Sequence, residues 1–134
     1  MKDTLFCYGT LQAPEIMESV SGMLPAAEAA RLSGYACYCL KNADYPAMTA
    51  TAGGLVRGKL YRGLDKRALT RLDRFEGELY SRVLIRVETD THQSISAWAY
   101  VINRSWHHRL TDRLWIYEEH SEVFLNRFRR HKTV

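Results

Sequence analysis

Apolar positions repeat along the chain with two different periods, and each period predicts a different kind of element. Near the N-terminus, residues 4–8 form a short run of strand-forming residues that stops at Gly9. Such a run predicts a buried strand followed by a turn. Pro14 can then occupy the first turn of a short helix, because a proline there gives up only an N–H that has no partner.

The pattern is less decisive in the next part of the chain. Residues 26–41 fit either a helix or a strand, although Gly34 and the alternation of Tyr and Cys favour a strand in the second half. The tripeptide at residues 44–46 predicts a turn or an extended loop. Residues 55–61 alternate as a half-buried strand does, and Gly58 in their middle indicates a close backbone approach or a bulge.

The clearest element is an amphipathic helix. Between Leu64 and Phe75 the apolar residues recur at helical spacing, and Lys and Arg fill many of the other positions. Asp65 can cap the start of this helix, and Gly77 can end it.

After this helix the apolar positions alternate in two runs that are separated by a polar loop, which predicts a hairpin. Its second strand places Trp98 and Tyr100 on the same face. A polar link follows, and Thr111 or Asp112 is predicted to cap a last helix over residues 111–131. The sequence therefore predicts an α+β fold that is closed by a helix.

Length and composition narrow the class of protein. The 134 residues fit a single domain over residues 1–134, and the hydrophobic and charged fractions of 46% and 25% are ordinary for a soluble globular protein. No apolar run is long enough to span a bilayer, and the N-terminus lacks the pattern of a secretory signal. We therefore expect a cytoplasmic protein that does not enter a membrane.

The cysteines and the basic residues have simple structural explanations. Cys7, Cys37 and Cys39 lie in apolar stretches without a complete set of metal ligands, which favours buried free thiols over a metal or redox site. Much of the net charge of +4 lies in residues 127–132. Cations suit a helix C-terminus, so this interpretation is preferred to nucleic-acid contact. No metal or other cofactor is expected.

The first candidate site is the segment Tyr8-Gly9-Thr10-Leu11, where the predicted buried strand ends. Successive N–H groups in such a turn can face one anion, for example a carboxylate. An ordinary corner between a strand and a loop fits the same four residues.

The second candidate is the end of the amphipathic helix, where Asp73, Glu76 and Glu78 stand although the helix dipole disfavours acids there. If Glu76 points inward, burial and the dipole would raise its pKa towards the range that suits proton transfer. The alternative is that Glu76 and Glu78 lie in solvent and pair with nearby arginines. Asp73 is interpreted as an exposed acid beside Arg71 and Arg74.

Taken in order, these motifs resemble the gamma-glutamylcyclotransferase-like family. The matches span about residues 4–102, and the ordered set is specific although each motif alone is common. The last predicted helix matches no motif. The matching motifs are Tyr-Gly-Thr-Leu at 8–11, Tyr-Pro at 45–46, Val-x-Gly-x-Leu-Tyr at 56–61, Leu-Asp-x-Phe-Glu-Gly-x-x-Tyr-x-Arg at 72–82, and a strand that ends in Tyr100.

The resemblance implies a small mixed β-barrel with flanking helices. It also implies a small-molecule gamma-glutamyl amide as substrate, whose α-amine attacks its own side-chain carbonyl and releases 5-oxoproline and an amine. Glu76 would be the general acid and base, and the backbone of residues 9–11 would hold the α-carboxylate. The implied substrate-binding residues are Tyr8, which lines the wall, then Gly9, Thr10 and Leu11, and with less support Tyr100.

Two alternatives stay open at this point. The chain could be a binding module that kept the pocket and lost turnover, with the basic tail contacting a nucleic acid or a protein. It could also be a related cyclotransferase that acts on a carrier-attached or modified gamma-glutamyl group. The complete Phe-Glu-Gly-x-x-Tyr-x-Arg sequence favours an enzyme. The sequence specifies neither the leaving amine nor the number of subunits.

Overall fold

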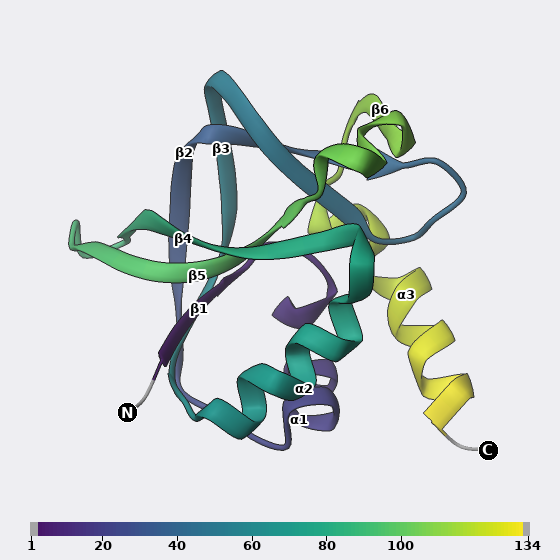
Figure 1. The fold of residues 1–134 in the computed structure, drawn as a ribbon. Coiled ribbons are helices and arrows are strands. Elements are labelled where there is room, and N and C mark those ends of the chain that lie inside the picture. Colours follow the sequence, from purple (N-terminus) through teal and green to yellow (C-terminus); the bar gives the residue numbers. More distant parts are fainter. Residues whose placement is uncertain (1–2, 133–134) are drawn as a thin grey trace.

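The structure, a computed structural model, describes residues 3–132 and contains a small closed β-barrel with flanking helices (Figure 1). The predicted α+β class and the mixed barrel are therefore confirmed. The barrel strands are β1 (Asp3–Cys7), β2 (Ala27–Leu40), β3 (Pro46–Leu64), β4 (Tyr80–Thr89) and β5 (Ser94–Ile102).

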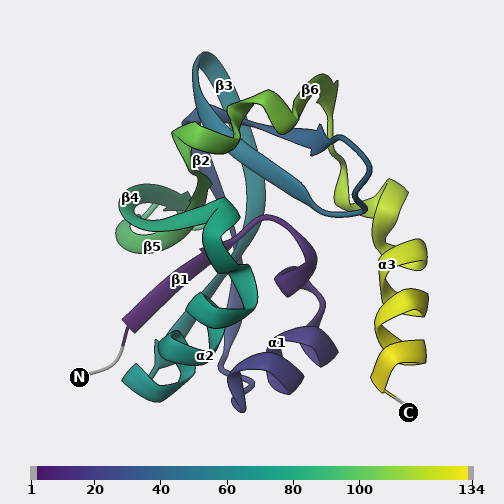
Figure 2. The same cartoon turned by 45° about the vertical axis from the view of Figure 1, so that its right-hand side comes forward.

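The barrel closes because β3 and β2, which stand at the two ends of its strand order, pair with each other. The strand order is β3-β1-β5-β4-β2, and β2 pairs again with β3. The β1–β5 pair is parallel and the other pairs are antiparallel, which makes the barrel mixed. A sixth strand, β6 (Leu110–Leu114), is added to the far end of β2 (Figure 2).

The segment 26–41, which fits either a helix or a strand by sequence, forms strand β2 over residues 27–40, and β2 pairs with β3 in a long hairpin. Its register runs from the pair Ala27 and Tyr61 to the pair Cys39 and Pro46, so the first half of β2 is held by pairing with β3. The strand predicted over residues 55–61 extends to all of β3. A Cβ atom at Gly58 would lie 2.3 Å from a backbone oxygen of β1, which confirms the predicted close approach.

The first two helices lie side by side at one end of the barrel (Figure 1). Helix α1 (Pro14–Ser21) carries its proline in the first turn, as predicted. Helix α2 (Lys66–Glu76) is capped by Asp65, whose Oδ1 accepts the N–H of Ala68 at 2.8 Å, and ends at Gly77 with a φ of 71°. Both predicted boundaries of α2 are confirmed.

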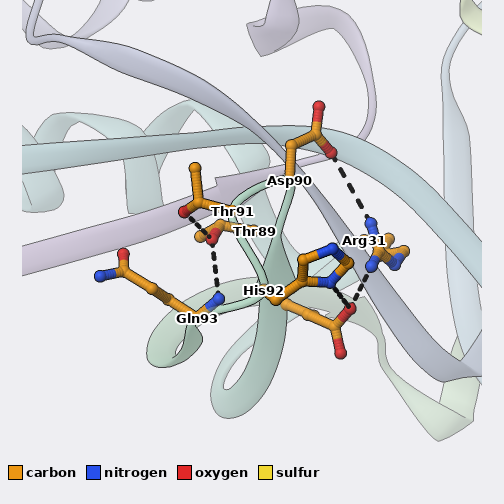
Figure 3. Close-up of polar contacts among 7 residues, drawn as sticks. Arg31, Thr89, Asp90, Thr91, His92 and Gln93 are labelled. Carbon is orange, nitrogen blue, oxygen red and sulfur yellow. Dashed lines mark hydrogen bonds and ion pairs between the residues drawn. The ribbon is translucent and has the colours of Figure 1, made fainter.

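The predicted β4–β5 hairpin is present, and a polar cluster fixes its tip to β2 (Figure 3). The buried Thr89 accepts the N–H of Gln93 at 3.1 Å through its Oγ1. Arg31 on β2 pairs with Glu88 and, at 3.7 Å, with Asp90. These contacts lie where β2 and β4 meet, so they support the closure of the barrel.

The predicted start of the last helix is wrong. Residues 110–114 form β6, and Thr111 donates its hydroxyl to the Cys39 carbonyl at 2.7 Å instead of capping a helix. The pairs Tyr38–Leu114 and Leu40–Leu110 complete the free end of β2. The last helix, α3 (Tyr117–Lys132), therefore begins six residues after Thr111.

The core fills the barrel and continues between the barrel and the helices. The three cysteines are buried and free, as predicted. Among residues 3–132, no helix is both long and apolar enough to cross a bilayer. The largest fully buried side chains include Phe6, Met17, Met48, Leu60, Tyr61 and Leu72.

Candidate active site

A pocket of about 470 Å³ lies where the end of β1 meets the end of α2. Its walls come from the loop after β1, the loop before β3, strand β5 and helix α3. All six residues singled out in the sequence line this pocket: Tyr8, Gly9, Thr10, Leu11, Glu76 and Tyr100. The fold therefore brings the two candidate sites together.

Tyr8 forms part of the wall, and its hydroxyl is used within the protein. The hydroxyl donates to the Tyr100 carbonyl at 2.6 Å and accepts the N–H of Met48 at 3.2 Å. Burial raises the pKa of Tyr8 well above its ordinary value, so the hydroxyl keeps its proton. The ring of Tyr8 thus shapes the pocket, while its hydroxyl ties the loop after β1 to β5 and β3.

Side chains from the loop itself and from the barrel hold the loop after β1 in place. Gln12 donates its amide to the Tyr8 carbonyl at 2.8 Å, and the Tyr61 hydroxyl donates to the Leu11 carbonyl at 3.0 Å. Residues 10–12 form one turn of 3-10 helix, whose first N–H groups have no partner within the turn. The loop therefore reaches the pocket with donors that the turn does not use.

Gly9 allows the loop to pack against the opposite wall. A Cβ atom at this position would lie 3.2 Å from two ring carbons of Pro46. Tyr45 and Pro46 both line the pocket, so the Tyr-Pro pair borders the site and is more than a plain turn.

Glu76 is the last residue of α2, and its side chain lines the pocket. Among residues 3–132, no hydrogen bond or ion pair involves its carboxyl group. Burial, and then the charge of Asp73, raise its pKa to about 8. The structure thus places the half-buried Glu76 at the pocket, in contrast to the alternative in which it pairs with an arginine in solvent.

Asp73 has a larger role than the sequence interpretation gave it. Its Oδ1 accepts the Tyr100 hydroxyl at 2.7 Å and Nε of Arg82 at 2.9 Å, so its partners are not the neighbouring arginines of its own helix. One sequence feature could have indicated this role: Asp73 stands three residues before Glu76, which puts both acids on one face of α2. Asp73 joins α2 to the β4–β5 hairpin beside the pocket.

Tyr100 and Tyr80 line the pocket from the two strands of this hairpin. Burial first, and then the hydrogen bond to Asp73, raise the pKa of Tyr100 above its ordinary value. The Tyr80 hydroxyl donates to the Pro46 carbonyl at 2.5 Å, and burial raises its pKa as well. Both phenols therefore stay protonated and serve as fixed walls.

The outer wall of the pocket comes from a region to which the sequence assigned no function. Phe124, Arg127 and Phe128 of α3 line it together with Asp44 from the loop before β3. Nη1 of Arg127 lies 2.6 Å from Oδ2 of Asp44. The spacing of the three α3 residues puts them on one helix face, and the sequence analysis did not identify this face or what it contacts.

The chemical character of the pocket is that of a proton-transfer site. One carboxyl group with a raised pKa faces a space that has mostly apolar and aromatic walls. Within the described residues, no group of three or more His, Cys, Asp or Glu side chains is arranged to hold a metal ion. The arrangement suits chemistry in which a single carboxyl group moves protons for a bound molecule.

The barrel and this pocket define the class of the protein as a small closed α+β barrel with a pocket between the end of β1 and the end of α2. The sequence model described as "Gamma-glutamyl cyclotransferase, AIG2-like" matches residues 5–121. The chain belongs to this family. The match extends past residue 102, where the motifs read from the sequence end, and includes β6 and the start of α3.

Known proteins support this assignment. AIG2-like protein C of Arabidopsis thaliana is 36% identical over 98 residues, which cover 72% of this chain and 57% of that relative. The matched part thus spans little more than half of the relative's length. A solution structure of an Arabidopsis thaliana protein has a TM-score of 0.77 at 28% identity and covers 98% of this chain and 82% of that one.

A solved gamma-glutamyl cyclotransferase has the same fold. Its TM-score to this chain is 0.66 at 18% identity, with 77% of this chain and 68% of that one covered. At this identity the likeness concerns the fold alone.

Proposed function

We propose that the protein is a gamma-glutamyl cyclotransferase. In this reaction the α-amine of a gamma-glutamyl amide attacks the side-chain carbonyl of the same molecule, and 5-oxoproline and an amine are released. The observation that carries the proposal is the carboxyl group of Glu76, which has no partner among residues 3–132 and lines the same pocket as the loop after β1.

The reaction needs little from the protein beyond position and proton transfer. Nucleophile and electrophile belong to one molecule, so holding the glutamyl chain in a curled form can supply several kcal/mol through proximity. The Glu76 carboxylate accepts a proton from the α-ammonium, and the new N–C bond closes a five-membered ring. When the old amide C–N bond breaks, Glu76 returns this proton to the departing nitrogen. The second proton of the former α-ammonium passes from the ring nitrogen to the released amine, which leaves as an ammonium.

The raised pKa of Glu76 suits both halves of this cycle. With a pKa of about 8, the carboxyl group exists in both protonation states near neutral pH. The positive charge of a bound α-ammonium favours the carboxylate form, so substrate binding itself prepares the base. Once protonated, the same group is an acid of suitable strength for the leaving nitrogen.

The other pocket residues can hold the glutamyl part of the substrate. Backbone N–H groups of Gly9, Thr10 and Leu11 would bind the α-carboxylate, because such donors suit an anion. The rings of Tyr8 and Tyr100 would flank the methylene groups. The Tyr100 hydroxyl already donates to Asp73, so its contribution to substrate contact is mainly steric.

A covalent mechanism through the nearby thiol has less support. Cys7 lines the pocket, but burial raises its pKa well above the ordinary value, which keeps the weakly nucleophilic thiol form. An intramolecular amine nucleophile makes such a residue unnecessary.

The rival proposal of a non-catalytic module with a nucleic-acid-binding tail gains no specific support from the basic residues. Arg127 pairs with Asp44, and Arg129 pairs with Glu15 of α1 at 2.5 Å. These two cations connect α3 to other elements.

The test is to incubate the protein with a panel of gamma-glutamyl amides and to measure 5-oxoproline. We expect Glu76→Gln to fold and bind a gamma-glutamyl compound but to turn over at least roughly 100-fold more slowly, the size of an acid and base contribution. Glu78→Gln is the matched control, because Glu78 is an exposed acid of the same pocket, and we expect it to stay within about threefold of the parent.

Two results would count against the proposal in different ways. Full activity of Glu76→Gln would remove Glu76 from its role while leaving the reaction in place. Absence of 5-oxoproline from every compound, together with measurable binding, would favour the non-catalytic module.

A further inference from the structure

The face that α3 presents to the pocket has no part in the chemistry described above. Phe124, Arg127 and Phe128 line the outer part of the pocket, whereas the glutamyl end is assigned to the loop after β1 and to Glu76. A gamma-glutamyl amide has a second end, which is the amine that leaves. With the glutamyl end held at the loop, this second end must occupy the remaining part of the pocket.

Helix α3 is fixed against the barrel by an aromatic cluster at its start. The buried Trp115 stacks on Phe124 with ring centroids 6.2 Å apart and an interplanar angle of 22°. The indole N–H of Trp115 donates to the Asp44 carbonyl at 3.0 Å. The same side chain thus positions both the helix and the loop that meet at the outer wall.

Asp44 holds Arg127 through a sheltered oxygen. Oδ2 of Asp44 is buried and accepts no well-aligned hydrogen bond among the described residues, but Nη1 of Arg127 lies 2.6 Å from it and forms an ion pair. Among residues 3–132, no other acid pairs with Arg127. A guanidinium group carries five N–H donors in a rigid fork, so one ion pair with Asp44 keeps the group at the pocket and leaves other donors available for a ligand.

Arg127 is also the only cationic side chain among the described residues that line the pocket. The other charged groups there are Asp44, Glu76 and Glu78. Repulsion from the acids would disfavour an anionic leaving group in most of the pocket, and the neighbourhood of Arg127 is the exception. Guanidinium and carboxylate groups match in geometry and form strong charge-assisted hydrogen bonds.

We propose that Arg127, positioned by Asp44, is a specificity-determining residue that binds a carboxylate on the leaving group of the substrate. The inference rests on the proposed cyclotransferase reaction and adds the chemical class of the amine: an amino acid or peptide is preferred to a simple alkylamine. Arg127 acts by binding and takes no part in proton transfer, and Asp44 is a positioning residue.

Three matched compounds test this inference: gamma-glutamylglycine, which carries the carboxylate, its neutral glycinamide analogue, and gamma-glutamylmethylamide, which lacks the group. We expect kcat/KM of the unmodified protein to be at least about tenfold higher for gamma-glutamylglycine than for the other two compounds. A single charge-assisted hydrogen bond can supply a preference of this size. The preference should reside mainly in KM, because the contact is made equally before and during the reaction.

Variants assign the preference to the residue. We expect Arg127→Gln to remove the preference by weakening only gamma-glutamylglycine, Arg127→Lys to keep part of it, and Asp44→Asn to give an intermediate loss. Arg129→Gln is the matched control, since it removes a charge from the same helix that pairs with Glu15 outside the pocket lining, and it should leave the preference unchanged.

Binding measurements separate failure of this inference from failure of the proposed function. Calorimetric Kd values for gamma-glutamylglycine and its glycinamide analogue give the same comparison without turnover, so a preference that is lost in Arg127→Gln supports the inference even if no 5-oxoproline forms. Equal Kd values, absence of binding, or an equal loss for all compounds in Arg127→Gln would overturn it. Thermal unfolding of each variant checks that it is folded.

Discussion

The pocket contains two sheltered carboxyl groups that the protein treats in opposite ways. Glu76, on the inner wall at the end of α2, has no ion-pair or hydrogen-bond partner among residues 3–132, and its pKa is raised to about 8. Asp44, on the outer wall, lies 2.6 Å from the guanidinium of Arg127. Both carboxyl groups line the same pocket, but only that of Asp44 has an arginine beside it among the described residues.

This difference indicates that the inner wall, with Glu76, suits proton transfer, and that the outer wall, with Asp44 and Arg127, suits substrate binding. A carboxyl group without a cation retains a high proton affinity, and that property is what a proton carrier needs. A carboxyl group paired with arginine serves as an anchor for the guanidinium. The inner wall is built from the barrel and α2, and the outer wall depends on α3.

The largest expected effect is on stability, and the two carboxyl groups should respond with opposite signs. The folded-state pKa of Glu76 exceeds its model value of 4.5, so stability that is fully present below about pH 4.5 is lost as the pH rises towards 8. We expect Glu76→Gln to raise the free energy of unfolding by roughly 2 to 4 kcal/mol at pH 8 and by nearly nothing at pH 4.5.

Urea unfolding across this pH range measures the effect, and Asp44→Asn is the paired variant. It should lower the free energy of unfolding by about 1 kcal/mol at pH 8, a figure kept small because Arg127 is largely exposed. If both substitutions were stabilising to the same extent, the contrast between the two walls would be lost.

The second effect concerns the pH dependence of catalysis. If the carboxylate form of Glu76 is the base, kcat/KM should rise close to tenfold per pH unit between about pH 6 and 7.5 and level off above 8. Initial rates of 5-oxoproline release give the profile, and a separate titration of the substrate α-ammonium allows its contribution to be subtracted. Arg127→Gln should keep this profile, and a flat profile in the parent protein would exclude Glu76 as the base.

The smallest effect is a single hydrogen bond on the inner wall. Tyr100→Phe removes the donor to Asp73, and we expect the free energy of unfolding to fall by about 1 kcal/mol. Tyr45→Phe is the control on the opposite side, because the Tyr45 hydroxyl makes no hydrogen bond among the described residues. Equal losses in both variants, again measured by urea unfolding, would show that the Asp73 contact adds nothing.

Local patterns predicted much of the inner wall. The period of α2, its cap at Asp65 and its end at Gly77 follow from interactions within a few residues, so they could be read directly. The loop at residues 8–11 and Glu76 were singled out from turn chemistry, from the helix dipole and from the family resemblance. The structure places them in one pocket, and their roles in catalysis remain proposals.

Predictions were weaker where an element depends on a distant partner. Thr111 has the composition of a helix cap, yet it donates to Cys39, because the free end of β2 needs a neighbouring strand. Asp73 is exposed, as predicted, but its partners come from β4 and β5 and not from the two arginines of its own helix. In both cases local preference was overruled by contacts across the fold.

The sequence by itself determined the α+β class, the amphipathic helix with its two ends, the β4–β5 hairpin and the motifs that indicate the family, because these depend on periodicity and on neighbours along the chain. Only the tertiary structure decided that β2 and β3 close a barrel and that α3 forms the outer wall. It also decided that Asp44 has a cation beside it while Glu76 has none within the described residues. Charge pairing and burial depend on residues far apart in the chain, and a one-dimensional pattern does not contain those distances.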